Sequence, residues 1–309
     1  MQFTSGVDIN PFIPPLIAFI ISFFTSQAGV SGAFLLLPFQ VSVLGFTSPS
    51  VSSTNLVYNI VAIPGGVYEY IKEKRMVWSL ALIIVLGTLP GVFIGAVIRI
   101  TYLPDPKPFK LFVGCVLLYL GFKLLYEAIA KRRGKINALE EKFSARVKEL
   151  KCSGKKRFAA GLPEDAAVKT LKVSLSRIEY EFWGEKFGFS TLSLFTLAFV
   201  VGIIGGIYGI GGGAIIAPFC VAVFGLPAYT IAGAALVGTF LTSIVGIIYY
   251  SSLGYPPDWM LGALFGLGGT LGMFFGARFQ KFMPEKAIRL ILGILVMSLA
   301  IRYIVQYFI

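Results

Sequence analysis

A glycine-rich run at residues 209–214, with the sequence GIGGGA, is the strongest candidate in this chain for binding a ligand. It formally fits the G-x-G-x-x-A pattern of dinucleotide sites, but such sites need an acidic residue about 20 positions later for the ribose. No acidic residue occurs between Glu185 and Asp258, and the Gly-Lys-Ser/Thr of a phosphate-binding P-loop is missing too. The run therefore indicates a break in a helix, where backbone N–H groups and the positive end of the next helix can face an anion. The alternative is that these glycines only allow tight packing.

A second run resembles the first at a constant distance of 180 residues. Residues 29–39 (GVSGAFLLLPF) align with residues 209–219 (GIGGGAIIAPF). The identical pairs are Gly29 and Gly209, Gly32 and Gly212, Pro38 and Pro218, and Phe39 and Phe219. The repeat indicates two related halves, and it favours a ligand site over simple packing because both halves keep the break.

Neutral hydrogen-bonding side chains are plentiful near both runs, whereas acidic ones are scarce. The polar side chains next to the runs are Ser26, Gln27, Ser31, Ser53, Asn55, Asn59, Thr239, Thr242 and Ser243. Asn55 and Asn59 are four residues apart and therefore share one face of a helix. Acidic residues occur only near segment ends, at Glu69, Glu127 and Asp258, so a carboxylate site for a cation is not available. Neutral donors and helix N-termini can bind an oxyanion without a fixed counter-charge.

The predicted substrate-binding residues come from both runs and from the helices that follow them. We expect the anion to contact Gln27, Gly29, Ser31, Gly32, Asn55, Asn59, Gly209, Gly211, Gly212, Gly213, Thr239 and Ser243. The plainer alternative is that each polar group bonds a carbonyl four residues earlier or a neighbouring helix. That alternative is stronger for a single Ser or Thr than for the pair of Asn residues.

The composition gives no support to metal, cofactor or catalytic chemistry. The chain has no His, and its three Cys lie far apart in the sequence, at positions 115, 152 and 220. These residues make no metal-ligand pattern, no disulfide framework and no nucleophile–base set. We therefore expect no metal, no cofactor and no enzymatic activity.

Hydropathy identifies the elements that must position these residues. The 309 residues have a mean hydropathy of +0.82, and only 14% are charged, against about a quarter in soluble domains. Apolar stretches suited to membrane helices lie at about 14–45, 50–71, 77–101, 108–130, 190–225, 228–251, 258–279 and 286–309. Four stretches, a charged loop and four more stretches predict an all-α polytopic integral membrane protein built from two repeats.

The first stretch of each half is too long for one crossing and short for two. Residues 14–45 would make a straight helix of about 48 Å, yet glycines lie near the middle of the stretch. A broken backbone survives in lipid only where protein or a wet cavity surrounds it. We expect a hairpin here in each half, followed by three further transmembrane helices. The third helices carry a glycine at every fourth residue, which predicts close helix packing at Gly87, Gly91 and Gly95 and at Gly268, Gly272 and Gly276.

Basic residues decide the predicted orientation. The loop at 131–190 carries 15 basic and 8 acidic side chains, which the positive-inside rule explains as a cytoplasmic loop. Nucleic-acid binding would instead need stacking aromatic residues on a soluble basic face. If each broken stretch returns to its own side, seven basic residues of the short loops share the side of the large loop and four lie opposite. That arrangement predicts inverted halves with both termini outside.

The same loop contains apolar residues at helical spacing, namely Ile136, Leu139, Phe143, Val147 and Leu150. We expect it to be partly helical and to lie on the membrane surface or cap the inner mouth. Two arginines, Arg99 and Arg278, align between the halves at a distance of 179 residues. They could draw anions into a vestibule on each side, but the plainer interpretation is that they reach for lipid headgroups.

The repeated glycine run followed by Pro and Phe, in a duplicated chain of eight segments, resembles the TauE/SafE sulfite exporter family. The second half is the closer match, and it adds the sequence GLP at 225–227 and a small-residue stretch at 232–239. The first half departs from the pattern, with Ser31 and Ala33 in place of two glycines. The resemblance covers nearly the whole chain except residues 131–187. It implies a membrane transporter for sulfite, organosulfonates or related organic anions.

The chain is thus expected to have three parts: an N-terminal membrane repeat at 1–130, a basic cytoplasmic loop at 131–187 and a C-terminal membrane repeat at 188–309. We expect it to transport a small anion across the cell membrane by alternating access at the repeat interface. Its expected partners are the anionic substrate, membrane lipid and, as an option, a second copy of the chain. Two alternatives stay open: a passive anion channel, and a sensor or assembly protein that does not transport.

Overall fold

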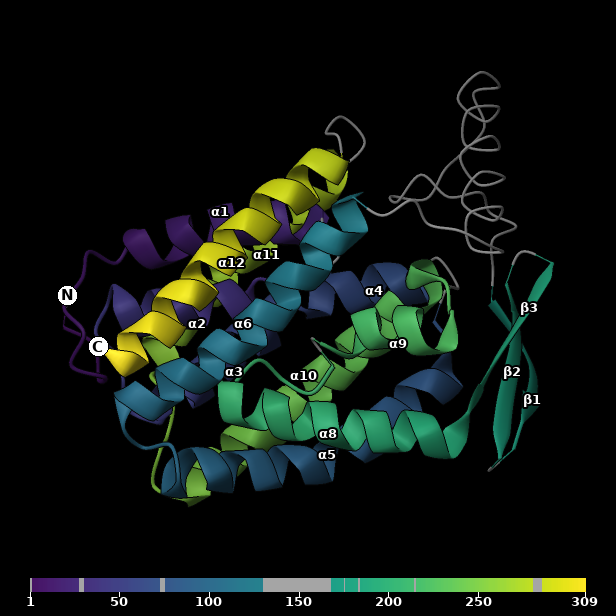
Figure 1. Ribbon diagram of the computed structural model, residues 1–309, viewed down its shortest axis with the longest axis horizontal. Coiled ribbons are helices and arrows are strands. Elements are labelled where there is room, and N and C mark those ends of the chain that lie inside the picture. Colours follow the sequence, from purple (N-terminus) through teal and green to yellow (C-terminus); the bar gives the residue numbers. More distant parts are fainter. Residues whose placement is uncertain are drawn as a thin grey trace.

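The computed structural model describes residues 2–27, 31–72, 76–129, 168–174, 176–182, 184–213, 215–279 and 285–309 (Figure 1). Its helices are α1 (Ile13–Gln27), α2 (Ala33–Ser42), α3 (Ser50–Ala62), α4 (Pro64–Lys72), α5 (Trp78–Thr101), α6 (Pro106–Ile129), α8 (Thr191–Tyr208), α9 (Ile216–Phe224), α10 (Ala228–Ser252), α11 (Trp259–Phe279) and α12 (Glu285–Phe308). Its strands are β1 (Val168–Val173), β2 (Arg177–Phe182) and β3 (Glu185–Ser190). The helices form one bundle, with the strands at one end and both termini at the other (Figure 1).

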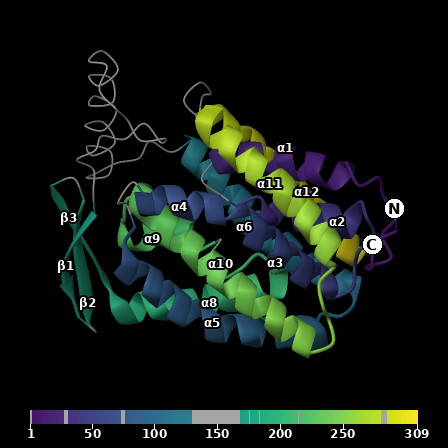
Figure 2. The same ribbon diagram turned by 180° about the vertical axis from the view of Figure 1, so that it is seen from behind.

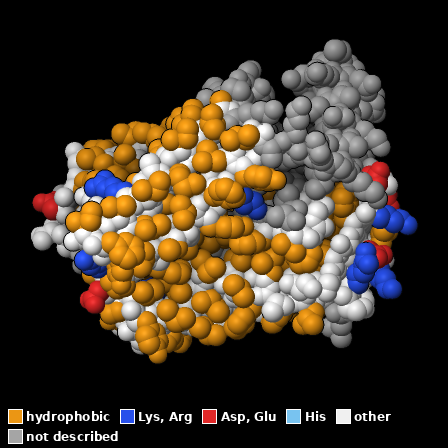
Figure 3. All heavy atoms as spheres, viewed as in Figure 1, with side chains coloured by type: hydrophobic (Ala, Val, Ile, Leu, Met, Phe, Trp, Pro, Cys, Tyr) orange, Lys and Arg blue, Asp and Glu red, His pale blue; other side chains and the backbone are white. Residues whose placement is uncertain are grey.

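The outer surface of the bundle suits a membrane. Six helices of the described segments are long and apolar enough to cross one: α5, α6, α8, α10, α11 and α12. Large apolar side chains such as Phe122 and Ile291 are 62% and 64% exposed. Hydrophobic side chains cover most of the face in Figure 3, and charged ones lie mainly toward its two ends. Such a band can face lipid without cost but not water, so the chain is a polytopic membrane protein, as the sequence predicted.

Each half begins with two helices separated by a break, as predicted. In the first half, residues 5–7 before α1 and residues 44–48 after α2 line the same hollow. In the second half, Phe189 before α8 and Phe224 at the end of α9 have ring centroids 6.4 Å apart. Because the residues before and after each helix pair lie together, both pairs are hairpins that return to the side from which they start.

The glycine stripes let helices approach until their backbones touch. On α5, a Cβ added at Gly91 would overlap the Phe199 carbonyl oxygen of α8 and lie 2.8 Å from the Ile203 nitrogen. On α11, a Cβ at Gly272 would overlap the Phe19 carbonyl oxygen of α1. Only a residue without a side chain allows such an approach. The predicted close packing is confirmed, and α5 and α8 lie side by side in both ribbon views (Figures 1 and 2).

These pairs join the two halves. The first helix of each half packs on the helix that forms the third apolar stretch of the other half: α1 packs on α11 and α8 packs on α5. The last helices, α6 and α12, pack on each other, and α3 contacts both α10 and α11. Neither half therefore makes a complete helical core by itself.

Helices at matching places in the two halves run in opposite directions where they meet. On α3 and α10, Asn59 bonds Ser243, whereas Leu56, three residues earlier, lies against Gly246, three residues later. On α6 and α12, a Cβ at Gly114 would lie 3.1 Å from the Tyr303 Cβ, and one at Gly121 would lie 3.1 Å from the Met297 nitrogen. Both pairs are therefore antiparallel.

A small sheet forms the C-terminal part of the basic loop and was not predicted. Its three antiparallel strands are in the order β1-β2-β3. Along β2, Ile178, Tyr180 and Phe182 are buried and alternate with glutamates, which is the period of a half-buried strand. The membrane part of the chain is therefore helical, as predicted, but the end of the loop forms a β-sheet. The predicted helical residues between 136 and 150 lie outside the described residues.

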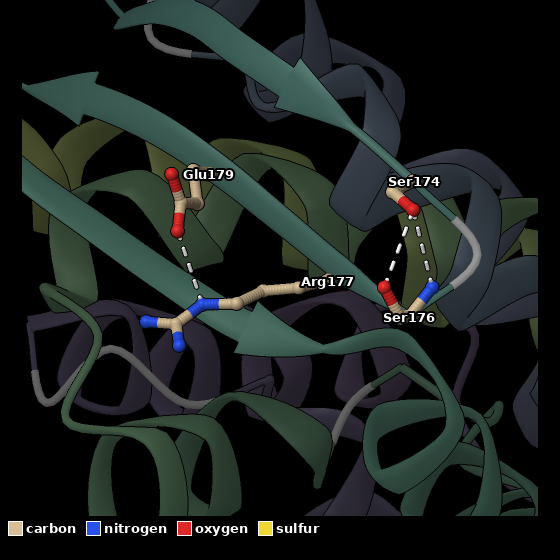
Figure 4. Close-up of polar contacts among 4 residues, drawn as sticks. All are labelled: Ser174, Ser176, Arg177 and Glu179. Atoms are coloured by element: carbon tan, nitrogen blue, oxygen red, sulfur yellow. Dashed lines mark hydrogen bonds and ion pairs between the residues drawn. The ribbon is translucent and has the colours of Figure 1, made fainter.

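The sheet contacts the bundle through a hydrogen bond between Tyr180 and Thr230, whose hydroxyl oxygens are 2.8 Å apart. Burial raises the pKa of the Tyr180 hydroxyl, so the group stays protonated and available for this bond. On the outer side of β2, the Arg177 Nε lies 3.1 Å from a Glu179 carboxylate oxygen (Figure 4). That ion pair is exposed to solvent and contributes little to stability.

Candidate substrate-binding site

The second break is formed by glycines in left-handed backbone conformations. Helix α8 ends at Tyr208, where Gly209 has φ +74° and donates its N–H to the Gly205 carbonyl at 2.9 Å. Gly211 has φ +76°. Glycine adopts this region without steric cost, whereas residues with a side chain rarely do. The chain resumes as a helix at Ile216.

The break is wedged between helices of both halves. A Cβ at Gly209 would lie 2.5 Å from the Ser52 Cα of α3, and one at Gly212 would lie 2.7 Å from the Thr88 Cγ2 of α5. A Cβ at Gly213 would lie 2.6 Å from the Thr239 hydroxyl of α10. The glycines therefore allow close packing as well as the break itself, and their contact with substrate stays a prediction.

Asn55 of α3 connects the two breaks. Its Nδ2 donates to the carbonyl of Ala33, the first residue of α2 after the first break, and to the Gly209 carbonyl of the second break, each at 3.0 Å. Its Oδ1 accepts from the Gln40 Nε2 at 3.2 Å. The side chains of Asn55 and Gln40 are both fully buried. A single amide thus links the interrupted helices of both halves.

Asn59, one turn later on the same face of α3, binds the second break only. Its Nδ2 donates to the Ile210 carbonyl at 3.0 Å and to the Ser243 hydroxyl of α10 at 3.2 Å. Asn55 and Asn59 therefore share one helix face, as predicted, but their N–H groups hold backbone and side-chain oxygens in this structure.

The backbone N–H groups of the break are partly occupied as well. The Gly212 N–H donates to the Thr242 hydroxyl at 3.1 Å. In this structure the Gly212 N–H therefore faces α10, and its contact with substrate stays a prediction. Ser31 accepts from the Ala33 N–H at 3.3 Å, and a Cβ at Gly32 would lie 2.7 Å from the Tyr58 hydroxyl. Both residues belong to the surroundings of the first break.

The remaining predicted residues divide into two groups, one within the described residues and one outside them. Thr239 donates to the Ala235 carbonyl at 2.8 Å, which is the intrahelical alternative. Ser243 and Gly211 lie together with Thr239, since a Cβ at Gly211 would lie 3.0 Å from the Ser243 hydroxyl. The side chain of Gln27 and the whole of Gly29 lie outside the described residues.

Several buried polar side chains around the breaks were not predicted from the sequence. Tyr208 donates to the Phe34 carbonyl at 2.6 Å, and Tyr250 donates to the Gly206 carbonyl at 2.7 Å. The Oε1 of Gln40 is also buried without a hydrogen-bond partner, as is the Oδ1 of Asn59, which was predicted. A polar residue inside an apolar stretch was the available signal for Gln40, because such residues are expensive in a membrane unless they have a function.

The cluster around the breaks is therefore polar, buried and free of acidic side chains among the residues described. Among the described residues, the buried acidic side chain is that of Asp258, which lies outside the cluster at the start of α11. No group of three or more His, Cys, Asp or Glu that could hold a metal ion occurs within the described ranges. The chemistry that the cluster offers is hydrogen bonding by amides, hydroxyls and backbone groups.

Comparison with known proteins identifies the family to which this arrangement belongs. The family model described as "Sulfite exporter TauE/SafE" matches residues 15–303. The chain belongs to this family. It is also similar to the "Probable membrane transporter protein YunE" of Bacillus subtilis (strain 168), with 22% identity over 290 residues that cover 91% of this chain and 92% of that protein. No solved structure matches the chain.

The TauE/SafE match spans both breaks and all six long apolar helices up to Tyr303. The resemblance that the glycine runs indicated is thereby confirmed. The chain is a multi-pass member of a membrane transporter family, and such a family is not an enzyme class.

Replacing either asparagine should weaken both the fold and substrate binding. Asn55→Ala removes the amide donor from two buried carbonyls, and a buried group that loses its partner costs about 1–3 kcal/mol. We expect a lower unfolding temperature in detergent and a half-saturating anion concentration raised by roughly one to two orders of magnitude. Asn59→Ala should act in the same direction. The matched control is Asn10→Ala, because Asn10 makes an exposed bond to the Phe12 N–H. Unchanged stability and affinity in both α3 variants would contradict the assignment.

Proposed function

We propose that this TauE/SafE member carries small oxyanions, namely sulfite or an organosulfonate, by alternating access at the interface of two inverted halves. One observation carries the proposal: Asn55 hydrogen-bonds the broken segments of both halves at once. Transporters of this general design place broken helices at the substrate site, because free backbone groups there can meet a ligand.

The helix pairing supports the inverted relation of the halves. Matching helices α3 and α10, and likewise α6 and α12, meet antiparallel, as a two-fold axis in the membrane plane requires. The exchange of first helices between the halves is symmetric too, since α1 packs on α11 as α8 packs on α5. Movement of one half against the other would therefore open and close the region around the breaks.

The hydrogen bonds of the cluster support an anion as cargo and indicate how it would enter. The donors are the amides of Asn55 and Asn59 and the Gly212 N–H, and in this structure internal oxygens accept from all of them. An anion is a stronger acceptor than a neutral carbonyl or hydroxyl, so it can compete for these donors when the halves separate. We interpret the observed arrangement as the closed form.

The burial of the cluster distinguishes this proposal from a passive channel. Asn55, Asn59, Thr242 and Ser243 are all fully buried, which fits a gated site better than a continuous open pore. A sensor or assembly protein would bind an anion without moving it.

A flux assay tests the proposed function directly. Purified protein in liposomes should transport sulfite or an organosulfonate among a panel of sulfite, sulfate, thiosulfate, sulfoacetate and taurine. A transporter should saturate and accumulate its substrate against a gradient when a suitable driving ion is supplied. Flux that never accumulates would favour the channel, binding without flux would favour the sensor, and transport of sodium or a neutral solute alone would contradict the proposal.

The orientation is a further part of the proposal. Both termini lie at the end of the bundle opposite the sheet (Figure 1), and we place the sheet and the basic loop in the cytoplasm. A cysteine introduced at Gln2 should react with an impermeant maleimide added to intact cells, whereas Cys152 should react only after the membrane is opened. Labelling of Cys152 in sealed cells would reverse the assignment.

A further inference from the structure

We propose that Arg99 is a fixed cation that binds the transported anion. The binding position would lie between the second glycine break and the side of the membrane on which both chain termini lie. This inference rests on the proposed function and adds a residue to it. The anion would be an oxyanion with at least two oxygens on one centre, such as a sulfite or a sulfonate group, because a guanidinium can donate to two of these oxygens at once.

Arg99 does not reach for lipid. It lies in the last turn of α5, and its side chain is fully buried. Its guanidinium donates to the Leu103 carbonyl and, at 3.1 Å, to the Thr47 carbonyl. The guanidinium carbon also lies 3.7 Å from the centre of the Phe109 ring. The headgroup interpretation of this residue is therefore wrong, and its position needs another explanation.

The charge of Arg99 has no acidic partner among the described residues. Its polar contacts are neutral carbonyls, and its Nε is buried without a hydrogen-bond partner. The buried acid Asp258 is engaged elsewhere, where it accepts from the Ser5 N–H and hydroxyl at 2.8 Å and from the Leu261 N–H at 3.0 Å. A buried cation without a counter-charge is strongly disfavoured in a membrane, so an anion would complete this site.

Arg99 also stands close to the glycine break. One turn earlier on α5, a Cβ at Gly95 would lie 2.8 Å from the Ile207 nitrogen at the end of α8. The Tyr250 hydroxyl of α10 donates to the Gly206 carbonyl in the same turn of α8. The cation is thus next to the last turn of α8, immediately before the break.

A hollow lies between the connection that contains Thr47 and the N-terminal segment. Thr47, whose carbonyl accepts from Arg99, lines a cavity of about 210 Å³ together with residues 5–7, 44–46 and Ser48. The carbonyl of Thr47 is the neutral acceptor that an incoming oxyanion would replace. The exchange would free the connection at residues 44–48 from α5 and admit the anion toward the break.

The test compares three arginine variants in liposomes and in detergent. Arg99→Gln removes the charge, Arg99→Lys keeps it but loses the planar pair of donors, and Arg302→Gln removes an exposed arginine near the end of α12. We expect Arg99→Gln to raise the half-saturating concentration of sulfite and of sulfoacetate by roughly 10- to 100-fold. Arg99→Lys should raise it by a smaller factor, and Arg302→Gln should match the wild type.

Thermal unfolding separates binding from a purely structural role. Sulfite or sulfoacetate should raise the unfolding temperature of the wild type and of Arg302→Gln, and not that of Arg99→Gln. If Arg99→Gln is less stable but keeps the half-saturating concentration and the anion-induced shift, Arg99 only ties α5 to Thr47 and the inference fails. If Arg99→Gln cannot be purified, Arg99→Lys decides, and wild-type half-saturation in that variant overturns the inference. If the wild type carries neither anion, the proposed function fails, and this inference fails with it.

Discussion

Gly209→Ala should abolish anion transport and lower the unfolding temperature of the protein in detergent. Gly209 has φ +74°, and a Cβ there would lie 2.5 Å from the Ser52 Cα and overlap the Ser52 carbonyl. The neighbouring atoms are backbone of α3 and cannot rotate away, so the break and α3 would have to separate. That separation would also lengthen the bond from Asn55 to the Gly209 carbonyl, on which the link between the halves depends.

Gly225→Ala is a matched control for this prediction. Gly225 has φ +62°, but nothing lies within 4 Å of a Cβ added there. The control therefore carries only the left-handed backbone penalty, about 1–2 kcal/mol, and should keep most of its flux. Equal flux in the two variants would show that close approach of the break to α3 is not needed for transport.

Gly91→Leu should prevent most of the protein from reaching its folded form. A Cβ at Gly91 would overlap the Phe199 carbonyl oxygen and lie 2.8 Å from the Ile203 nitrogen, and a whole leucine side chain cannot fit between two touching backbones. Because α5 and α8 come from different halves, the loss should affect the whole bundle. The yield of monodisperse protein in size-exclusion chromatography should fall several-fold.

Two comparisons check that this effect comes from the contact. Gly272→Leu should behave in the same way, since α11 meets α1 as α5 meets α8. Gly65→Leu should purify like the wild type, because Gly65 is exposed and nothing lies within 4 Å of an added Cβ. A normal elution profile for Gly91→Leu would mean that the two helices are not in backbone contact in the membrane.

The elements that follow from short-range pattern were predictable from the sequence. Glycines at every fourth residue identified the packing faces of α5 and α11, and the glycine runs identified both breaks. These features depend on the absence of a side chain, which the sequence states directly. The β period of residues 178–182 was equally visible, with Ile178, Tyr180 and Phe182 alternating with glutamates, but the apolar residues earlier in the loop directed the prediction toward a helix.

The partners of polar groups could not be predicted in the same way. The sequence shows that Asn55 and Asn59 share a helix face, but not that the Gly209 and Ile210 carbonyls lie within reach of their amides. An amide can bind either the substrate or a backbone carbonyl. Which of the two it binds depends on contacts between helices that are about 150 residues apart in the chain. Arg99 illustrates the same limit, because an arginine at the end of an apolar stretch can extend to the surface or fold inward beneath a neighbouring connection.

The exchange of first helices between the halves has a consequence for biosynthesis. When a ribosome has completed α5, the glycine face of that helix still has no partner, because α8 is encoded about a hundred residues later. At elongation rates of 5–20 residues per second, the face stays uncovered for roughly 5 to 20 s. The partner of α1 arrives later still, since α11 follows α8 and α10. During insertion the N-terminal half is therefore an unfinished surface, and lipid or the insertion machinery must occupy its grooves until the C-terminal half is made.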